Sequence, residues 1–376
     1  MTRREKVFIT SLINTDMDTD RRTLLRASGV AALIGSTGLA GCSGGLLGGD
    51  GGSGSSGPES WQYDPALLGD APNTFFGLMD YATIYENREF FPEDTRNSLE
   101  QTDSSTPVNP EDIDYLSGVG GGTVSMMDGS GSGAGSVAVA GSFDQSTVTE
   151  EVESQEDTTQ VGEYEGYTLY ESSEVSEQVG SDASGSATVG VSDGALVAGF
   201  AFASGTSTSS SGQDAVETAI DANNGDADLL QGSSEYATTL ADNIGDATAS
   251  FGGVGDPELI DQFSSTAESQ TQTYVEGMRA GGVGMALEGE TTTFTAVIAY
   301  ESSQAAGDTG LADLVSGFSS QVEQQEGINS VDGEQNDDAV VITVEGDTMT
   351  LLQQANQSSG MAGAGVTSMT APTGGF

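Results

Sequence analysis

The side chains on which most enzymes depend are scarce in this sequence. It contains no histidine, a single cysteine (Cys42) and a single lysine (Lys6), against 58 aspartates and glutamates. A Ser-His-Asp triad therefore has no base, and a Ser-Lys dyad, a Schiff base or a P-loop has no lysine beyond residue 6. Zinc sites rely mainly on His and Cys and are disfavoured for the same reason. We therefore predict a protein that is not an enzyme, with no catalytic residue and no cofactor.

Carboxylates are the remaining candidates for chemistry, either as a glycosidase acid–base pair or as calcium ligands. A chain with this many acids will place two carboxylates close together in almost any fold. A carboxylate pair is therefore weak evidence for a glycosidase site. The segment DANNGDAD, residues 221–228, superficially resembles a calcium-binding EF-hand loop. Its candidate ligands are Asp221, Asp226 and Asp228. However, Gly225 comes one residue too early, and Gly232 at the twelfth position has no carboxylate. We favour a helix ending at Asn224 with Gly225 as its left-handed cap, and no metal.

The only cysteine ends a short apolar stretch. Arg21 and Arg22 precede the apolar run from Ala27 to Leu39, and LAGC follows at residues 39–42. The run is too short to cross a bilayer, which takes roughly 20 apolar residues. A basic start, a short apolar middle and small residues at the end are typical of an export signal.

Over about residues 17 to 46 the chain resembles haloarchaeal lipoproteins that are exported by the twin-arginine route. The resemblance implies that Arg21 and Arg22 direct export. It also implies cleavage before Cys42, whose sulfur receives a lipid that holds the chain on the extracellular face of the cytoplasmic membrane. We therefore predict a signal peptide over residues 1–41, with Met17 as an alternative start.

The charge of the chain limits its partners. The formal net charge is −49, and the basic residues after Cys42 are Arg88, Arg96 and Arg279. Phosphate binding needs clustered Lys and Arg, so nucleic acid is excluded as a partner, and docking on an anionic membrane surface is disfavoured. Membrane contact is therefore expected through the lipid on Cys42. At about 1 M salt the Debye length is near 3 Å, which would screen such a charge. The acidic surface with almost no lysine resembles that of secreted haloarchaeal proteins.

The strand and helix signals occur twice in a similar order. Each half reads strand, helix, two strands, helix, strand, which is the order of a split βαβ, ferredoxin-like unit. We predict an α+β fold of two such modules in tandem, with antiparallel-rich sheets and helices on one face. The modules cover residues 72–235 and 236–356. A lipidated Gly/Ser tether over residues 42–71, with the only tryptophan, Trp61, near its end, precedes them.

The remaining predictions concern the tail and individual elements. Residues 357–376 are expected to be disordered like the tether, and Asn356, in the only N-x-S/T sequon, is a candidate glycosylation site. A strand is predicted over residues 74–85, and the clearest helix over residues 308–325. Three boundary signals are a turn at Asp193-Gly194, an N-cap at Asp256 with Pro257 at the first helical position, and a capping box at Thr147 and Glu150.

These features together predict a non-catalytic cell-surface lipoprotein. It would serve as an interaction or structural module of the haloarchaeal envelope and bind another envelope protein or itself. The alternative is a substrate-binding lipoprotein that captures a small ligand for a transporter, because two modules could close like two lobes. An enzyme that acts through carboxylates alone comes third.

Overall fold

The structure is a computed structural model that describes residues 57–102, 108–124, 130–155, 158–172, 183–204, 210–266 and 269–353. Several predictions lie outside these residues: the signal peptide with Met17, Arg21 and Arg22, the lipid acceptor Cys42, the sequon at Asn356 and the tail over 357–376.

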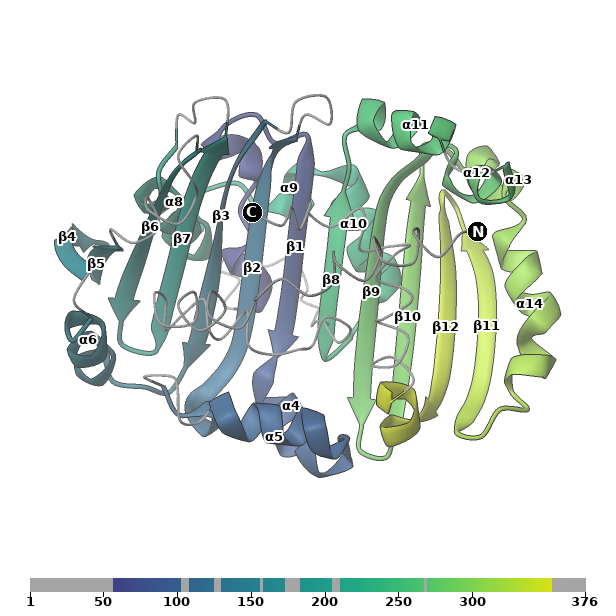
Figure 1. Ribbon diagram of the computed structural model, residues 1–376, viewed down its shortest axis with the longest axis horizontal. Helices are drawn as coiled ribbons and strands as arrows, with labels where there is room; N and C mark the ends of the chain where they lie inside the picture. The colour runs from purple at the N-terminus through teal and green to yellow at the C-terminus, as the bar shows by residue number, and fades with distance from the viewer. Residues whose placement is uncertain are drawn as a thin grey trace, which may run out of the picture.

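One antiparallel sheet of twelve strands forms the body of the protein (Figure 1). Across the sheet the strands follow the order β11-β12-β10-β9-β8-β1-β2-β3-β7-β6-β5-β4. Their bounds are β1 Asn73–Asp80, β2 Ile113–Val124, β3 Gly131–Gly141, β4 Thr158–Tyr164, β5 Tyr167–Ser172, β6 Ala183–Ser192, β7 Ala195–Ser204, β8 Ala249–Val254, β9 Met278–Glu288, β10 Thr291–Tyr300, β11 Ile328–Asn336 and β12 Ala339–Asp347.

Helices lie around this sheet. The α-helices are α4 Tyr81–Glu86, α5 Glu93–Thr102, α6 Gln145–Glu153, α8 Gly212–Asn224, α9 Leu230–Ser233, α10 Glu235–Ile244, α11 Pro257–Thr266, α12 Ser269–Val275, α13 Ser303–Asp308 and α14 Leu311–Val322. Short 3-10 helices are η1 Pro58–Trp61, η2 Pro65–Leu68, η3 Arg88–Phe90 and η4 Pro110–Asp112. A further helical segment covers residues 348–353.

The two halves of the chain repeat one strand order around the centre of the sheet. Reading outward, the first half gives β1-β2-β3-β7-β6 and the second gives β8-β9-β10-β12-β11. The halves meet where β1 pairs with β8, with Phe76 opposite Gly252 and Gly77 opposite Phe251. The repeated strand order defines a pseudo-two-fold axis between β1 and β8. Each Phe is paired with a Gly of the other strand, so Phe76 and Phe251 point to opposite faces of the sheet. The β4–β5 hairpin extends the first half only.

The prediction of two ferredoxin-like modules is wrong in two respects. A split βαβ unit contains parallel strands joined by a crossover, whereas the strand pairs in the described part of the chain are all antiparallel. The halves also share one sheet instead of each having its own. The predicted division at residue 235 falls in the first turn of α10. The coarser expectation of mixed helices and antiparallel strands is confirmed.

The helices between first and second strands cap the end of the sheet instead of crossing its face. The strand predicted over 74–85 ends at Asp80, whose side chain accepts a hydrogen bond from the Thr83 amide at 2.9 Å and so starts α4. From α4 and α5 the chain enters β2 at the same end of the sheet (Figure 1). Strand β2 therefore runs back antiparallel to β1. The sequence indicates this helical segment but not its path.

Helices cover both faces of the sheet, not the single face that was predicted. Adjacent strand residues point to opposite faces, and β12 shows where they go. Val341 belongs to the core cluster that contains Leu240 of α10, whereas Val340 belongs to the cluster that contains Ala306 of α13. Helices α8 and α10 pack on the first face, against β7, β3 and β6 and against β8, β9 and β10 respectively.

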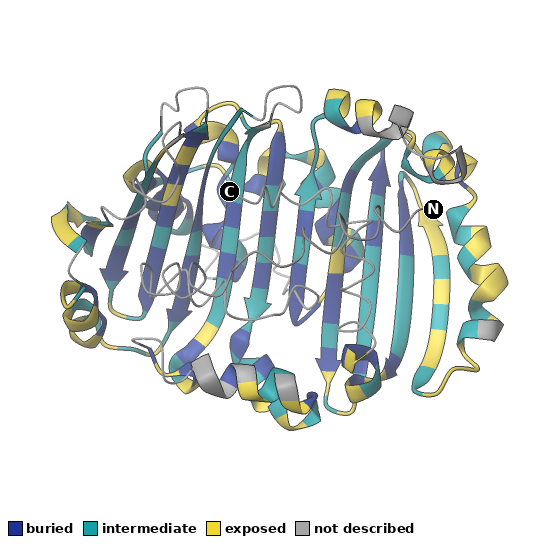
Figure 2. Cartoon of the chain, viewed as in Figure 1, coloured by how far each residue is buried: buried dark blue, intermediate teal, exposed yellow. Residues whose placement is uncertain are grey.

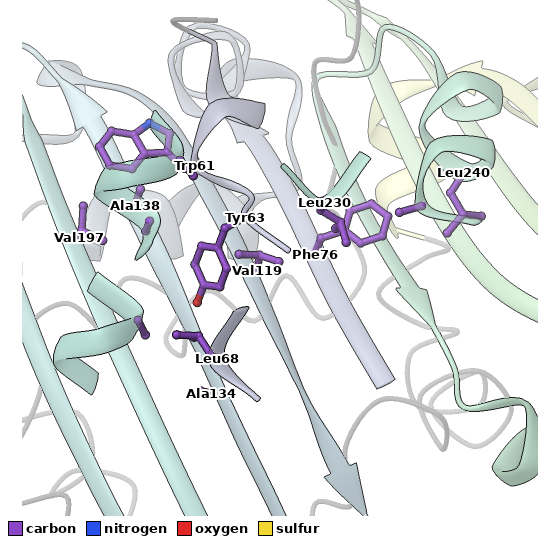
Figure 3. Packing of buried hydrophobic residues seen from close by; sticks show 14 of the residues in the cluster. Trp61, Tyr63, Leu68, Phe76, Val119, Ala134, Ala138, Val197, Leu230 and Leu240 are labelled. Atoms are coloured by element: carbon purple, nitrogen blue, oxygen red, sulfur yellow. The ribbon is translucent and has the colours of Figure 1, made fainter. Parts of the chain in front are cut away.

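The segment from Pro58 onward belongs to the folded body, although its sequence predicts part of the tether. Trp61 and Tyr63 are buried, with exposed fractions of 3% and 0%. The Trp61 indole donates a hydrogen bond to the Tyr115 hydroxyl at 3.2 Å. Figure 3 shows Tyr63 packed beside Val119. Two 3-10 helices begin at prolines and turn the chain across the sheet, which the Gly/Ser-rich composition upstream obscures.

Other local predictions had mixed outcomes. The turn at Asp193-Gly194 joins β6 to β7, and Asp256 and Pro257 begin α11 as predicted. Helix α6 begins at Gln145 after Asp144, so the capping box predicted at Thr147 is wrong. Strand β11 was missed because its mostly polar, exposed sequence INSVDGEQN has no apolar alternation.

Candidate functional site: the open face of the sheet

Among the described helices, none covers the central strands on the face of the sheet opposite α8 and α10 (Figure 1). Its outward side chains include Phe75, Val137, Phe200, Phe202, Phe251 and Val283, and we call this region the open face. Phe200, Phe202 and Val283 are 41%, 43% and 41% exposed, unusually high values for apolar residues within a sheet. Figure 2 shows these exposed positions as yellow bands on β7 and β9.

The register of the strands places these residues on one face. Directly opposed residues of antiparallel strands point to the same side. Phe202 pairs with Gly133, and Phe75 pairs with Gly120 on one side and Gly253 on the other. The same alternation continues from β7 through β3, β2, β1 and β8 to β9. The open face is therefore one continuous surface that crosses the pseudo-two-fold axis.

The open face carries no acidic side chain on these six strands. Between Asn73 and Met79 on β1, Leu116 and Gly122 on β2, and Leu196 and Phe202 on β7, every residue on this face is Gly, Ala, Val, Leu, Met, Phe or Asn. The corresponding positions of β3, β8 and β9 have the same composition. In a chain with 58 acids, this uncharged stretch of surface is a strong departure from the average.

Glycines let two phenyl rings lie across the sheet. A Cβ at Gly133 would come within 2.9 Å of the Phe202 ring, and one at Gly135 within 2.9 Å of the Phe200 ring. The phenyl groups of β7 therefore occupy the space above β3 where side chains would otherwise stand. This arrangement makes the open face low in relief.

Helices and charges border the open face. One apolar cluster, which includes Ile84 of α4, Leu99 of α5, Val148 of α6 and Leu352, covers one end of the strands. At the edges of the sheet, β11 exposes Glu334 and β4 carries Glu163, and charged edges oppose strand addition.

Two of the three arginines after Cys42 have partners outside the open face. Arg279 forms ion pairs with Asp261 at 3.2 Å and with Glu301 at 2.5 Å. The Arg88 guanidinium lies 3.9 Å from the centre of the Tyr85 ring. Neither arginine offers a free cation to an anionic ligand on the open face.

The three candidate calcium ligands do not form a ligand set. Asp221 accepts a hydrogen bond from the Tyr164 hydroxyl at 2.7 Å. The Asp226 amide donates to the carbonyl of Asp221 at 2.7 Å, and the carbonyl of Asp228 accepts from the Asp64 amide at 2.9 Å, so these contacts join backbone groups and not carboxylates. Across the described part of the chain, no group of three or more His, Cys, Asp or Glu side chains is placed to hold a metal ion.

The favoured interpretation of this segment as a helix end is confirmed. Helix α8 ends at Asn224, and Gly225 follows in the left-handed conformation with φ +83°. Its amide donates to the carbonyl of Ala222 at 3.0 Å. The sequence here serves to end a helix.

The perturbed titratable groups are tyrosines with structural explanations. The hydrogen bond to the Asp221 carboxylate raises the pKa of Tyr164 to about 12. Burial raises the pKa of Tyr300 to about 12, and its hydroxyl donates to the carbonyl of Tyr274 at 2.9 Å. Burial likewise raises the pKa of Tyr63. None of these three tyrosines lies on the open face.

Within the described ranges, no helix has both the length and the apolar character needed to cross a membrane.

The fold and the site define a mixed helix-and-strand protein with one large antiparallel sheet and an uncharged open face. No family model matches the chain, and no curated protein matches it. Among solved structures it is similar to crystal form IV of TP0453, with a TM-score of 0.39 and 9% identity over 79% of this chain and 98% of that chain. Crystal form III of TP0453 gives a TM-score of 0.37 and 8% identity over 78% and 98%. Likenesses of this size carry no conclusion about function.

Sequence reasoning missed the open face. Its signal is the absence of charge at alternate positions of several strands, as in VGGGTV at 119–124 and GFAFAS at 199–204. Each strand alone resembles an ordinary half-buried strand. Only the strand order brings the uncharged positions together.

Proposed function

We propose that this protein is a non-catalytic, lipid-anchored module of a haloarchaeal cell envelope, and that it acts by binding a protein through its open face. The observation that carries the proposal is the uncharged apolar face in a chain of net charge −49. Contiguous exposed apolar surface commonly marks an interaction site.

The anchoring part rests on sequence. The Arg21-Arg22 pair and LAGC at residues 39–42 support export followed by lipid attachment at Cys42. From Ser43 to the first described residue, Gly57, the chain is rich in glycine and serine, a composition that gives a flexible linker. Such a linker would hold the folded body near the membrane while leaving its open face accessible.

The ligand-capture alternative has less support. It relied on two modules that close on each other, and the β1–β8 ladder instead joins both halves in one sheet. The case against an enzyme rests on composition, because the segment after Cys42 has neither histidine nor lysine.

A pull-down from native membranes in detergent and molar salt tests the proposal. Tagged wild-type chain is compared with Phe202→Asp, which charges the open face, and with Phe318→Asp on α14 as a control of similar exposure (53%). We expect a bound protein that the first variant loses and the control keeps. Intact mass of the same sample reports whether the chain begins at a lipidated Cys42. An unlipidated chain, or identical bound proteins for all three samples, would contradict the proposal.

A further inference from the structure

The composition of the open face restricts what can cover it, and this inference rests on the proposed function. We propose that the open face binds the open face of a second copy of this chain, in a symmetric dimer with the two sheets packed face to face.

Charge favours a second copy over another acidic protein. An apolar contact that buries an unpaired carboxylate loses the hydration of that group, which is costly. Most of the surface of a chain with 58 acids is therefore a poor partner for the open face. The open face of a second copy brings no carboxylate, and a two-fold contact sets the same patch against itself.

The available area suits a dimer of modest size. Six strands at about 4.8 Å spacing and about 20 Å of exposed strand length give roughly 600 Å² per copy. Two copies would then bury roughly 1,200 Å² in total, which is at the lower end of specific protein interfaces.

The relief of the face suits sheet-on-sheet packing. Packed sheets lie about 10 Å apart with their strands about 30° from alignment, which requires surfaces without large protrusions. The rings of Phe200 and Phe202 lie across β3 because Gly135 and Gly133 leave room for them. The glycines of β2 opposite Phe75 and Val137 leave a shallow strip into which apolar side chains of the second copy fit.

Sedimentation velocity in molar sodium chloride, over a range of protein concentrations, tests the dimer. The full chain carries Cys42→Ser, so that no lipid contributes to association. We expect a concentration-dependent dimer that Phe202→Asp weakens roughly 100-fold or more, because each copy adds an unpaired carboxylate to the interface. The control Phe318→Asp should leave the dimer intact, since Phe318 is exposed on α14, which packs on the edge strands β11 and β12 and not on the six strands of the open face.

Two further variants keep the test decisive if Phe202→Asp does not fold. Val283→Asp places a charge on the opposite side of the pseudo-two-fold axis and should also break the dimer. Phe202→Leu keeps the site apolar and should retain it. Circular dichroism confirms the fold of each variant before sedimentation.

Three results would overturn the dimer. The first is a wild-type chain that sediments as a monomer at every concentration. The second is a monomer that becomes a dimer when residues 357–376 are deleted, since that segment would then cover the face. The third is a monomer whose native mass spectrum retains a lipid that Phe202→Asp loses. These results concern the dimer alone. The proposed function is tested separately, by the lipidation of Cys42 and by the pull-down.

Discussion

Both faces of the central sheet are rich in glycine, but glycine has a different role on each. Beneath α8, a Cβ at Gly199 would stand 2.2 Å from the carbonyl oxygen of Gly212, so glycine there admits a helix backbone. On the open face, Gly133 admits the phenyl ring of Phe202 from the neighbouring strand. The nearest atom to a Cβ at Gly199 belongs to a helix backbone, whereas the nearest atoms to a Cβ at Gly133 belong to a ring that can move into solvent. We therefore expect stability to depend on the first face and association on the second.

The largest expected effect comes from Gly199→Ala. The new methyl group would meet the α8 backbone, which cannot move without disturbing the sheet contact. We expect a loss of about 3 kcal/mol in the free energy of unfolding, measured by denaturant titration in molar salt. Gly162→Ala on β4 is the matched control, because no atom lies within 4 Å of the position that its new Cβ would take. Equal effects of the two substitutions would contradict the close packing of α8.

A second pair compares the two faces directly. A Cβ at Gly284 would come within 2.4 Å of Ile244 in α10, which is only 6% exposed, so Gly284→Ala should cost about 2 kcal/mol. At Gly133 the nearest atoms belong to the Phe202 ring, which can rotate outward, and the Gly121 carbonyl oxygen follows at 3.1 Å, so Gly133→Ala should cost less, about 1 kcal/mol. Thermal melts of the two variants measure the difference. A larger loss at Gly133 would reverse the assignment of the rigid face.

The end of the covering helix α8 offers a third pair. Gly225→Ala forces a methyl group onto a residue with φ +83° and should lower stability by about 1 kcal/mol. Gly317 lies inside α14, and a Cβ added there would have no atom within 4 Å, so Gly317→Ala should raise stability by about 0.5–1 kcal/mol. Opposite signs in chemical denaturation are the expected result. Two losses would show that Gly317 also has a structural requirement.

The smallest effect concerns alkaline pH. The pKa of Tyr164 and the pKa of Tyr300 are each raised from 10.0 to about 12 in the folded chain. The unfolded chain therefore loses these protons first, so their contribution is complete below pH 10 and is lost as pH rises toward 12. We expect the denaturation midpoint to fall over this interval. Tyr164→Phe should make the fall less steep, and an unchanged slope would contradict the Tyr164–Asp221 hydrogen bond as its cause.

Caps, turns and helix starts could be predicted from the sequence wherever a single short segment determines them. The cap at Gly225, the turn at Asp193-Gly194 and the start of α11 at Pro257 each depend on a residue whose backbone preference is strong. The division into two modules failed because nothing local distinguishes a helix that crosses a sheet from one that caps its end. That distinction depends on where β2 begins relative to the end of β1.

The open face could not be predicted from the sequence for a related reason. Phe75, Phe202 and Val283 are far apart in the chain and meet only through the strand order. Helix α14 shows the opposite case. Leu314 and Phe318 are four residues apart, the spacing of residues on one helix face, and yet they are 40% and 53% exposed. Periodicity marks one side of an element, but the position of that element in the fold decides whether the side is covered.

Hydroxyl-radical footprinting of the wild-type chain at low and high protein concentration tests the role of the open face most directly. We predict that oxidation of Phe200 and Phe202 falls as concentration rises, while oxidation of Phe318, on the exposed side of α14, stays constant. Oxidation of Phe200 and Phe202 that does not change with concentration would contradict the claim that a second copy covers the open face.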